Sequence, residues 1–137
     1  MQLTLPKLPF DILITSRQLV SGQHINYIGG LLTSFVGALT ALAGGAQAGS
    51  PILDAAFNEI TTVTSANDSV QLPIARVGLR VCVTNSGAGN SLQIFANQAG
   101  TDTINGTAGA TGVALAQNAT ALFICTKTGV WRRFVSS

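Results

Sequence analysis

Large apolar residues follow a helical spacing in the first third of this chain, from His24 to Leu42. The gaps between them are three and one, which is the spacing of one face of a helix. The residues concerned are Ile25, Ile28, Leu31, Leu32, Phe35, Val36, Leu39 and Leu42. This pattern predicts one short helix over residues 24–42, with Ile28, Leu32, Phe35 and Leu39 along one face as a contact between copies of the chain.

Glycine weakens this predicted helix and then ends it. The pair Gly29-Gly30 lowers the intrinsic helix propensity by roughly 0.8–1 kcal/mol per glycine, so the helix needs a packing partner. Further glycines and Pro51 follow closely, which predicts a Gly/Ala linker over residues 43–51. Residues 17–51 are therefore expected to form a helix-plus-linker segment, followed by a short helical turn at 53–57.

An extended arm is predicted for residues 1–16. Pro6 and Pro9 exclude a regular helix there and favour extended backbone. Apolar residues alternate along the segment at Leu3, Leu5, Phe10, Ile12 and Ile14. We expect these five to dock on a shell or on a neighbouring subunit; a first strand of the same domain is the alternative.

Short β-rich runs separated by Gly, Asn, Ser and Asp begin at Glu59. They predict eight strands, at residues 59–64, 69–73, 78–84, 91–96, 102–105, 112–116, 120–126 and 130–135. Alternation places Leu79, Val81 and Val83 on one face and Arg80, Cys82 and Thr84 on the other. The fold expected is mainly β: a small antiparallel β-sandwich or barrel knob over residues 52–137, preceded by the arm and one short helix.

Charge is scarce throughout the chain. Charged residues make up 9% of the sequence, against roughly 25% in an ordinary soluble domain. No Asp, Glu, Lys or Arg occurs in the 36 positions from 18 to 53. Such a run is expected to be covered by other protein or to lie in a bilayer, and residues 28–48 are long enough for a membrane anchor. No basic residue flanks that stretch closely, which favours covering by protein.

Few side chains are suited to chemistry. Five carboxylates lie apart in the sequence and the one histidine is His24, so we expect no enzyme, no metal site and no cofactor. The seven basic residues form no block, and no nucleic-acid partner is expected. Cys82 and Cys125 are predicted to be free and buried, although they would approach each other if their strands paired. Four aromatic residues within strands are expected to be core: Phe95, Phe123, Trp131 and Phe134.

Several segments of the chain resemble small structural proteins of tailed bacteriophages. They are residues 41–51 and 59–73, Val81-Cys-Val-Thr-Asn85, Leu92-Gln-Ile-Phe95, Asp102-Thr-Ile-Asn-Gly106, Ala121-Leu-Phe-Ile-Cys125 and Gly129-Val-Trp131. The likeness is to capsid decoration (cement) and head-fibre proteins and covers residues 40–137. It implies a β-rich homotrimer on the outside of a capsid, bound to the major capsid protein, and no catalytic residues.

The sequence therefore leads to one main functional hypothesis and two alternatives. The main hypothesis is a structural virion protein, made in the host cytoplasm, that decorates and stabilises the outer surface of the capsid. The first alternative is a head-fibre or tail-fibre-like adhesion module that binds a host glycan or receptor. The second is a small membrane-anchored protein, spanning the bilayer through residues 28–48.

Overall fold

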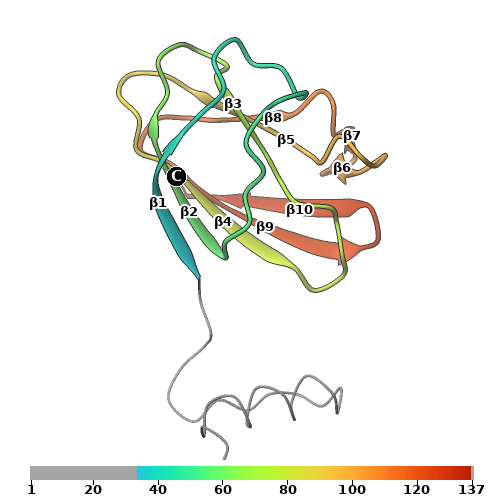
Figure 1. Cartoon of the computed structure of the whole chain (residues 1–137). Coiled ribbons are helices and arrows are strands. Elements are labelled where there is room, and N and C mark those ends of the chain that lie inside the picture. Colours follow the sequence, from blue (N-terminus) through green and yellow to red (C-terminus); the bar gives the residue numbers. More distant parts are fainter. Residues whose placement is uncertain (1–33, 137) are drawn as a thin grey trace, which may run out of the picture. The chain divides into compact units, whose positions relative to one another are not determined.

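Ten strands form two sheets in residues 34–136, the part of the chain that the computed structural model describes (Figure 1). The strands are β1 (Phe35–Thr40), β2 (Phe57–Thr62), β3 (Ser69–Gln71), β4 (Arg80–Asn85), β5 (Leu92–Phe95), β6 (Thr103–Ile104), β7 (Thr107–Ala108), β8 (Val113–Leu115), β9 (Thr120–Lys127) and β10 (Val130–Val135). The larger sheet has the order β1-β2-β4-β9-β10-β6-β7, and the smaller has the order β3-β5-β8.

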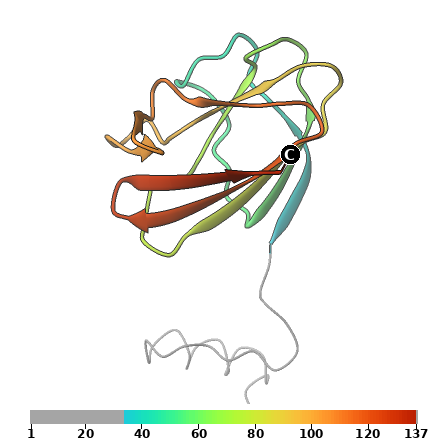
Figure 2. The ribbon, with the colours of Figure 1, turned by 180° about the vertical axis from the view of Figure 1, so that it is seen from behind.

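The first half of this domain winds back and forth between the two sheets. β1, β2 and β4 are neighbours in the larger sheet and run parallel, and β3 and β5 run parallel in the smaller one. Ile52 also bridges to Gln71 in parallel, so the segment between β1 and β2 returns along the smaller sheet. Each pass through a sheet therefore lies beside the previous pass, in a solenoid-like stack (Figure 2).

The second half closes this stack with antiparallel strands. β9 pairs with β4 on one side and β10 on the other, and β8 pairs with β5. The turn that joins β9 to β10 contains Gly129 at φ 74°, a backbone conformation that glycine adopts readily. The prediction of a purely antiparallel sandwich or barrel is thus wrong, because alternation within a strand carries no information on the direction of its neighbours.

A mainly β domain is confirmed, and all eight predicted strands appear within two residues of their expected ends. β7, of only two residues, was not predicted. The predicted helical turn at 53–57 is wrong, since Leu53 donates its backbone N–H to the Gln71 carbonyl and β2 begins at Phe57. Among the described residues no helix forms.

The predicted helix over 24–42 is wrong where the structure describes it, because Phe35–Thr40 is strand β1. Phe35 pairs with Phe57 and Leu39 with Ile60, which leaves one extra residue in β1 between these pairs. Ala38 has φ 57° at this β-bulge. The extra residue places Phe35 and Leu39, four residues apart, on opposite faces of β1, so the strand lacks regular alternation, and the spacing of its apolar residues also matches a helix.

The β domain consequently begins earlier than the expected boundary at residue 52. β1 belongs to the same sheet as the strands of 52–137, and Ala41 contributes to the same core. The arm residues Leu3, Leu5, Phe10, Ile12 and Ile14, together with Ile28 and Leu32, lie outside the described residues.

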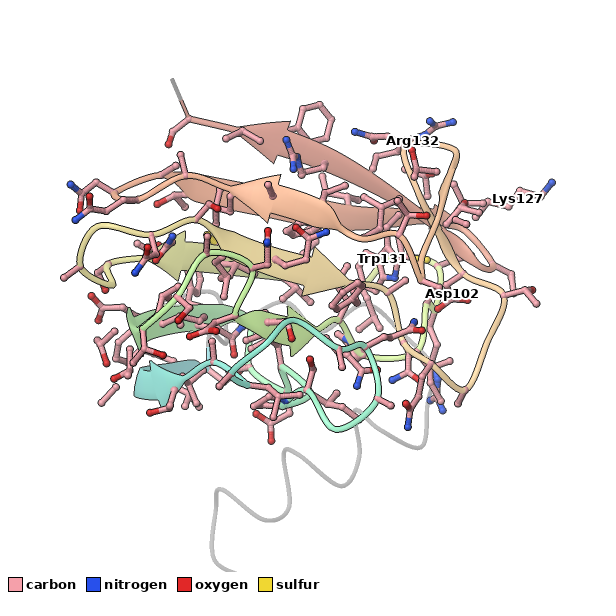
Figure 3. The ribbon with its side chains drawn as sticks, turned by 90° about the horizontal axis from the view of Figure 1, so that it is seen from above. Asp102, Lys127, Trp131 and Arg132 are labelled. Atoms are coloured by element: carbon pink, nitrogen blue, oxygen red, sulfur yellow. The ribbon has the colours of Figure 1, made fainter. Side chains whose placement is uncertain are left out.

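The core lies between the two sheets and is built from alternate residues of each strand. Ile60, Val83 and Phe123 of the larger sheet are fully buried against Val70 and Ile94 of the smaller one. Trp131 is also fully buried, and Figure 3 shows it in the interior while Lys127 and Arg132 point outward. Phe95, Phe123 and Trp131 are therefore core residues as predicted, but Phe134 is 60% exposed and was wrongly assigned to the core.

Buried Asp68 ties together the loops at one end of the stack. Its Oδ2 accepts hydrogen bonds from the Thr64 hydroxyl at 2.7 Å, the Thr64 N–H at 2.8 Å and the Ser65 N–H at 3.0 Å. Its Oδ1 accepts one from the Gly44 N–H at 3.1 Å. The Thr64 hydroxyl, followed by the backbone donors, holds the pKa of Asp68 below its ordinary value of 3.8.

Replacing Asp68 with Asn should lower the melting temperature at pH 7, because an amide accepts these four bonds less well than a carboxylate. The lowered pKa means that the stabilisation by Asp68 is complete above its unfolded-state value. It is lost as the pH falls from about 5 through the folded-state pKa. Thermal unfolding between pH 7 and pH 2 should therefore show the two proteins converging at low pH. A difference in melting temperature that is constant over this range would contradict the assignment.

Candidate functional site

Five strands of the larger sheet place an apolar side chain at the same level on its outer face, away from the smaller sheet. Phe35 is the register partner of Phe57, Phe57 of Cys82, Cys82 of Leu122, and Leu122 of Phe134. We call these five residues the outer-face stripe. Outward and inward residues alternate in a strand, so their neighbours in sequence, such as Val83 and Phe123, face the core.

The outer-face stripe is largely exposed in the described domain. Phe35 is 66% exposed, Phe134 60%, Phe57 44% and Leu122 37%. At roughly 200 Å² for a whole aromatic side chain, the three phenylalanines alone leave on the order of 300 Å² of apolar surface in water. The largest apolar patch on a monomer is typically about this size, and such a patch is often functional.

Gly37 allows Phe35 to lie flat on the sheet. A Cβ atom at position 37 would come within 2.8 Å of the Cζ atom of the Phe35 ring. The ring therefore covers the backbone of its own strand, where any side chain at residue 37 would displace it. A hollow of about 220 Å³ lies beside it, lined by Phe35, Phe57, Asn58, Glu59, Cys82 and Thr84.

Two rows of mostly polar side chains border the outer-face stripe, and they differ in charge. On one side the register partners are Arg80, Ile124 and Arg132; Arg80 and Arg132 are exposed. On the other side they are Glu59, Thr84 and Thr120. Ser86 Oγ donates a hydrogen bond to Glu59 Oε1 at 2.8 Å, which fixes one oxygen of this carboxylate. The outer face thus has a basic row, an apolar row and a row that contains an acid.

The two cysteines lie on opposite faces of the larger sheet, although their strands pair. Cys82 is half-buried in the outer-face stripe, whereas Cys125 is buried in the core, and both are free thiols. Burial raises the pKa of each thiol. Cys125 Sγ also donates to the Lys127 carbonyl at 3.2 Å. A raised pKa keeps a cysteine mostly protonated at neutral pH, so neither has the activated thiolate of a catalytic cysteine.

A second apolar surface lies where the chain crosses from β3 to β4. Val77 is 66% exposed, Ile52 54%, Ile74 51% and Leu79 36%; we call these four residues the end patch. Two hollows, of about 370 and 400 Å³, border it and share Pro73 and Leu79. Buried Asp102 accepts a hydrogen bond from the Ala75 N–H at 2.9 Å, which anchors this loop to the domain.

Two residues of the predicted oligomer contact, Phe35 and Leu39, lie in the described domain. Phe35 belongs to the outer-face stripe, whereas Leu39 points toward the core. Leu39 packs against the core, so these two residues cannot serve one outward contact. Phe57, Leu122 and Phe134 were not predicted as surface contacts. The alternation in Phe57-Asn-Glu59 and Arg132-Arg-Phe134 indicates that these phenylalanines share a face with charged residues. Only the strand register shows that they lie in one row.

The described residues hold no arrangement suited to metal chemistry or to a membrane helix. Within 34–136, no three His, Cys, Asp or Glu residues come together in a group that could bind a metal ion. In the same range, no helix is long and apolar enough to cross a bilayer. Residues 35–40 of the candidate anchor 28–48 form strand β1, so the continuous helix expected of that alternative is absent there.

Compared with known proteins, the chain matches no family model and no curated protein. The resemblance to phage structural proteins therefore depends on the sequence segments named above.

Proposed function

We propose that this chain is a structural virion protein: a homotrimeric decoration protein that binds the outside of a shell of major capsid protein and stabilises it. One observation carries the proposal above the others. A charge-poor domain exposes two separate apolar surfaces, the outer-face stripe and the end patch. Two such surfaces suit a subunit that contacts two kinds of neighbour, its own copies and the shell.

Stabilisation of the shell would be mechanical. A decorating subunit that spans neighbouring capsomers buries apolar surface on both, at about 25 cal/mol for each Å² removed from water. Each contact is modest after the costs of association. A trimer engages several sites at once, so the second and third contacts form at high effective concentration. The apolar arm of residues 1–16 is part of the proposal as a further contact with the shell.

The end patch is the shell contact that the described domain supports best. Its loop is held by Asp102 through the Ala75 N–H, so it is ordered before binding and loses little conformational entropy on docking. Charged side chains lie at its border: Arg76 lines the same hollow as Ile52 and Ile74, and Arg80 and Asp54 line the second hollow. An apolar patch with charges at its border is typical of a protein interface.

The double substitution Ile74→Ser and Val77→Ser should weaken binding to undecorated shells by about tenfold or more, since each removes roughly 1 kcal/mol of apolar burial. Co-sedimentation with shells of the virus that encodes the chain would measure this. Thr107→Ser, on exposed β7, is the matched control and should bind as the unaltered protein does. Full binding by the double variant would remove the end patch from the proposal, and no binding by the unaltered protein would remove the decoration function.

The adhesion alternative draws on a different feature, the three exposed phenylalanines. Aromatic rings at a receptor-binding tip usually lie on loops that project from the domain. Phe35, Phe57 and Phe134 instead lie on the face of a sheet, in one register row. This arrangement fits a broad protein contact better than a glycan site, and we therefore rank decoration first.

A further inference from the structure

We propose that the outer-face stripe is the contact between copies of this chain, and that Arg80 of one copy forms an ion pair with Glu59 of a neighbouring copy. This inference rests on the proposed homotrimer and is independent of the shell. It names the surface that holds the copies together and the charges that set their orientation.

The first argument is the size and position of the apolar surface. The outer-face stripe crosses five adjacent strands, from edge strand β1 to β10. At a spacing of about 4.8 Å between strands it is roughly 19 Å long. Its phenylalanines and Leu122 expose apolar area on the order of 300–400 Å², which matches the apolar core of one side of a standard interface of about 800 Å² per partner. The polar rows on both sides would supply the rim.

The second argument is that one copy carries both halves of the charge pattern. Arg80 and Arg132 lie on one side of the stripe, and Glu59 lies on the other. When copies are related by a rotation axis parallel to the stripe, the basic row of each copy meets the acid-containing row of the next. The outer face of one copy is then complementary in charge to the outer face of the next. A second copy of the chain therefore accounts for the charge pattern, and no unrelated partner is needed.

The geometry brings one particular pair together in this arrangement. Arg80 is on β4 and Glu59 is on the adjacent strand β2. A rotation about an axis parallel to the stripe keeps each residue at its level along the stripe. Arg80 of one copy then lies about one strand spacing, roughly 4.8 Å, from the level of Glu59 in the next. Ser86 already holds the other carboxylate oxygen of Glu59, Oε1, which leaves Oε2 to face the neighbouring copy.

The opposite orientation is disfavoured by charge. A two-fold axis perpendicular to the stripe, along the strands, would place the basic row of one copy against the basic row of the other. Arg80 would then face Arg80, and like charges brought together in an interface cost several kcal/mol. The charge rows therefore select the axis that runs parallel to the outer-face stripe.

Charge exchange tests the pairing. Arg80→Glu and Glu59→Arg should each raise the dissociation constant for self-association by about tenfold or more. The double variant Arg80→Glu with Glu59→Arg should return it to within about threefold of the unaltered value, because the pair is restored with its signs reversed. Sedimentation equilibrium without detergent gives these constants, and Arg76→Glu, outside the stripe, is the matched control.

The outcomes separate this inference from the proposed function. If the double variant loses as much free energy of self-association as the two single variants added together, the proposed ion pair is wrong. Oligomers unaffected by either single change would overturn the stripe as the contact, while the decoration function would stand. An unaltered chain that remains monomeric at every concentration would remove the homotrimer and, with it, this inference.

Cys82 supplies a second measurement that does not depend on the charged variants. It lies at the centre of the stripe, so the axis brings the Cys82 residues of neighbouring copies close together. Packed sheets lie about 10 Å apart, too far for a disulfide but within reach of a short bis-maleimide. The cross-linker should join copies of the unaltered chain and fail with Cys82→Ser, in which buried Cys125 remains. Equal cross-linking of both proteins would contradict the central position of Cys82.

Discussion

Replacing Asn85 with alanine is expected to lower the free energy of unfolding by about 3–5 kcal/mol, because the buried amide joins three chain segments and each bond lost leaves a buried polar group unpaired. Asn85 Nδ2 donates to the Asn90 carbonyl at 2.9 Å and to the Leu115 carbonyl at 3.0 Å. Its Oδ1 accepts from the Gly87 N–H at 3.2 Å. The side chain has no exposed surface, so water cannot replace these partners without opening the domain.

Urea unfolding followed by the fluorescence of buried Trp131 would measure this loss. Gln93→Ala is the matched control, since Gln93 Nε2 makes a single exposed bond to the Thr111 carbonyl at 2.9 Å. That substitution should cost less than about 1 kcal/mol. Similar losses for both variants would show that Asn85 does not organise the end of β4 in the way its contacts indicate.

The double substitution Phe35→Ser and Phe134→Ser is expected to convert the assembly into folded monomers, raising the dissociation constant by about 100-fold or more. These are the two most exposed residues of the outer-face stripe. Loss of two aromatic anchors from an interface commonly costs 2 kcal/mol or more for each. Both side chains point away from the core, so the domain itself should keep its stability or gain solubility.

Ile74→Ser and Val77→Ser, in the end patch, provide the comparison: two apolar residues are replaced in the other exposed apolar surface. That variant should keep its oligomeric mass while losing shell binding. If it dissociates and the Phe35/Phe134 variant does not, the two surfaces have been assigned to the wrong partners. Unfolding of the Phe35/Phe134 variant, seen as loss of the buried Trp131 signal, would show instead that the phenylalanines support the domain.

The sequence predicts most strands of this domain because they are short, alternating and separated by residues suited to turns. Asn105 and Gly106, for example, have φ values of 52° and 87° in the turn between β6 and β7, and both residue types are suited to such a turn. These are local properties, and local sequence determines them. Inward Val81 and Val83 and outward Arg80, Cys82 and Thr84 follow from the same alternation.

The first strand could not be predicted because its local pattern is misleading. The bulge at Ala38 turns Leu39 inward to pair with Ile60 while Phe35 stays outward. Phe35 and Leu39 therefore lie on opposite faces although they are four positions apart in the sequence, and in a helix the same spacing would place them on one face. Only pairing with β2, an interaction over some twenty residues in sequence, decides in favour of the strand.

The outer-face stripe could not be predicted from the sequence for a related reason. Each of its five residues comes from a different strand, and the order β1-β2-β4-β9-β10 passes over the strands between them in the sequence, which belong to the smaller sheet or to the far edge of the larger one. A single phenylalanine in a strand, such as Phe134, is indistinguishable from a core residue until the sheet is assembled. The charge rows on either side of the stripe likewise appear only when the register is known.

The molecular mass of the unaltered chain in solution, measured by sedimentation equilibrium across a wide concentration range without detergent, tests the central claim most directly. The account predicts a homotrimer whose dissociation requires dilution and is promoted by substitution of Phe35 and Phe134. A monomer at all concentrations, with the same mass as the Phe35→Ser/Phe134→Ser variant, would contradict it.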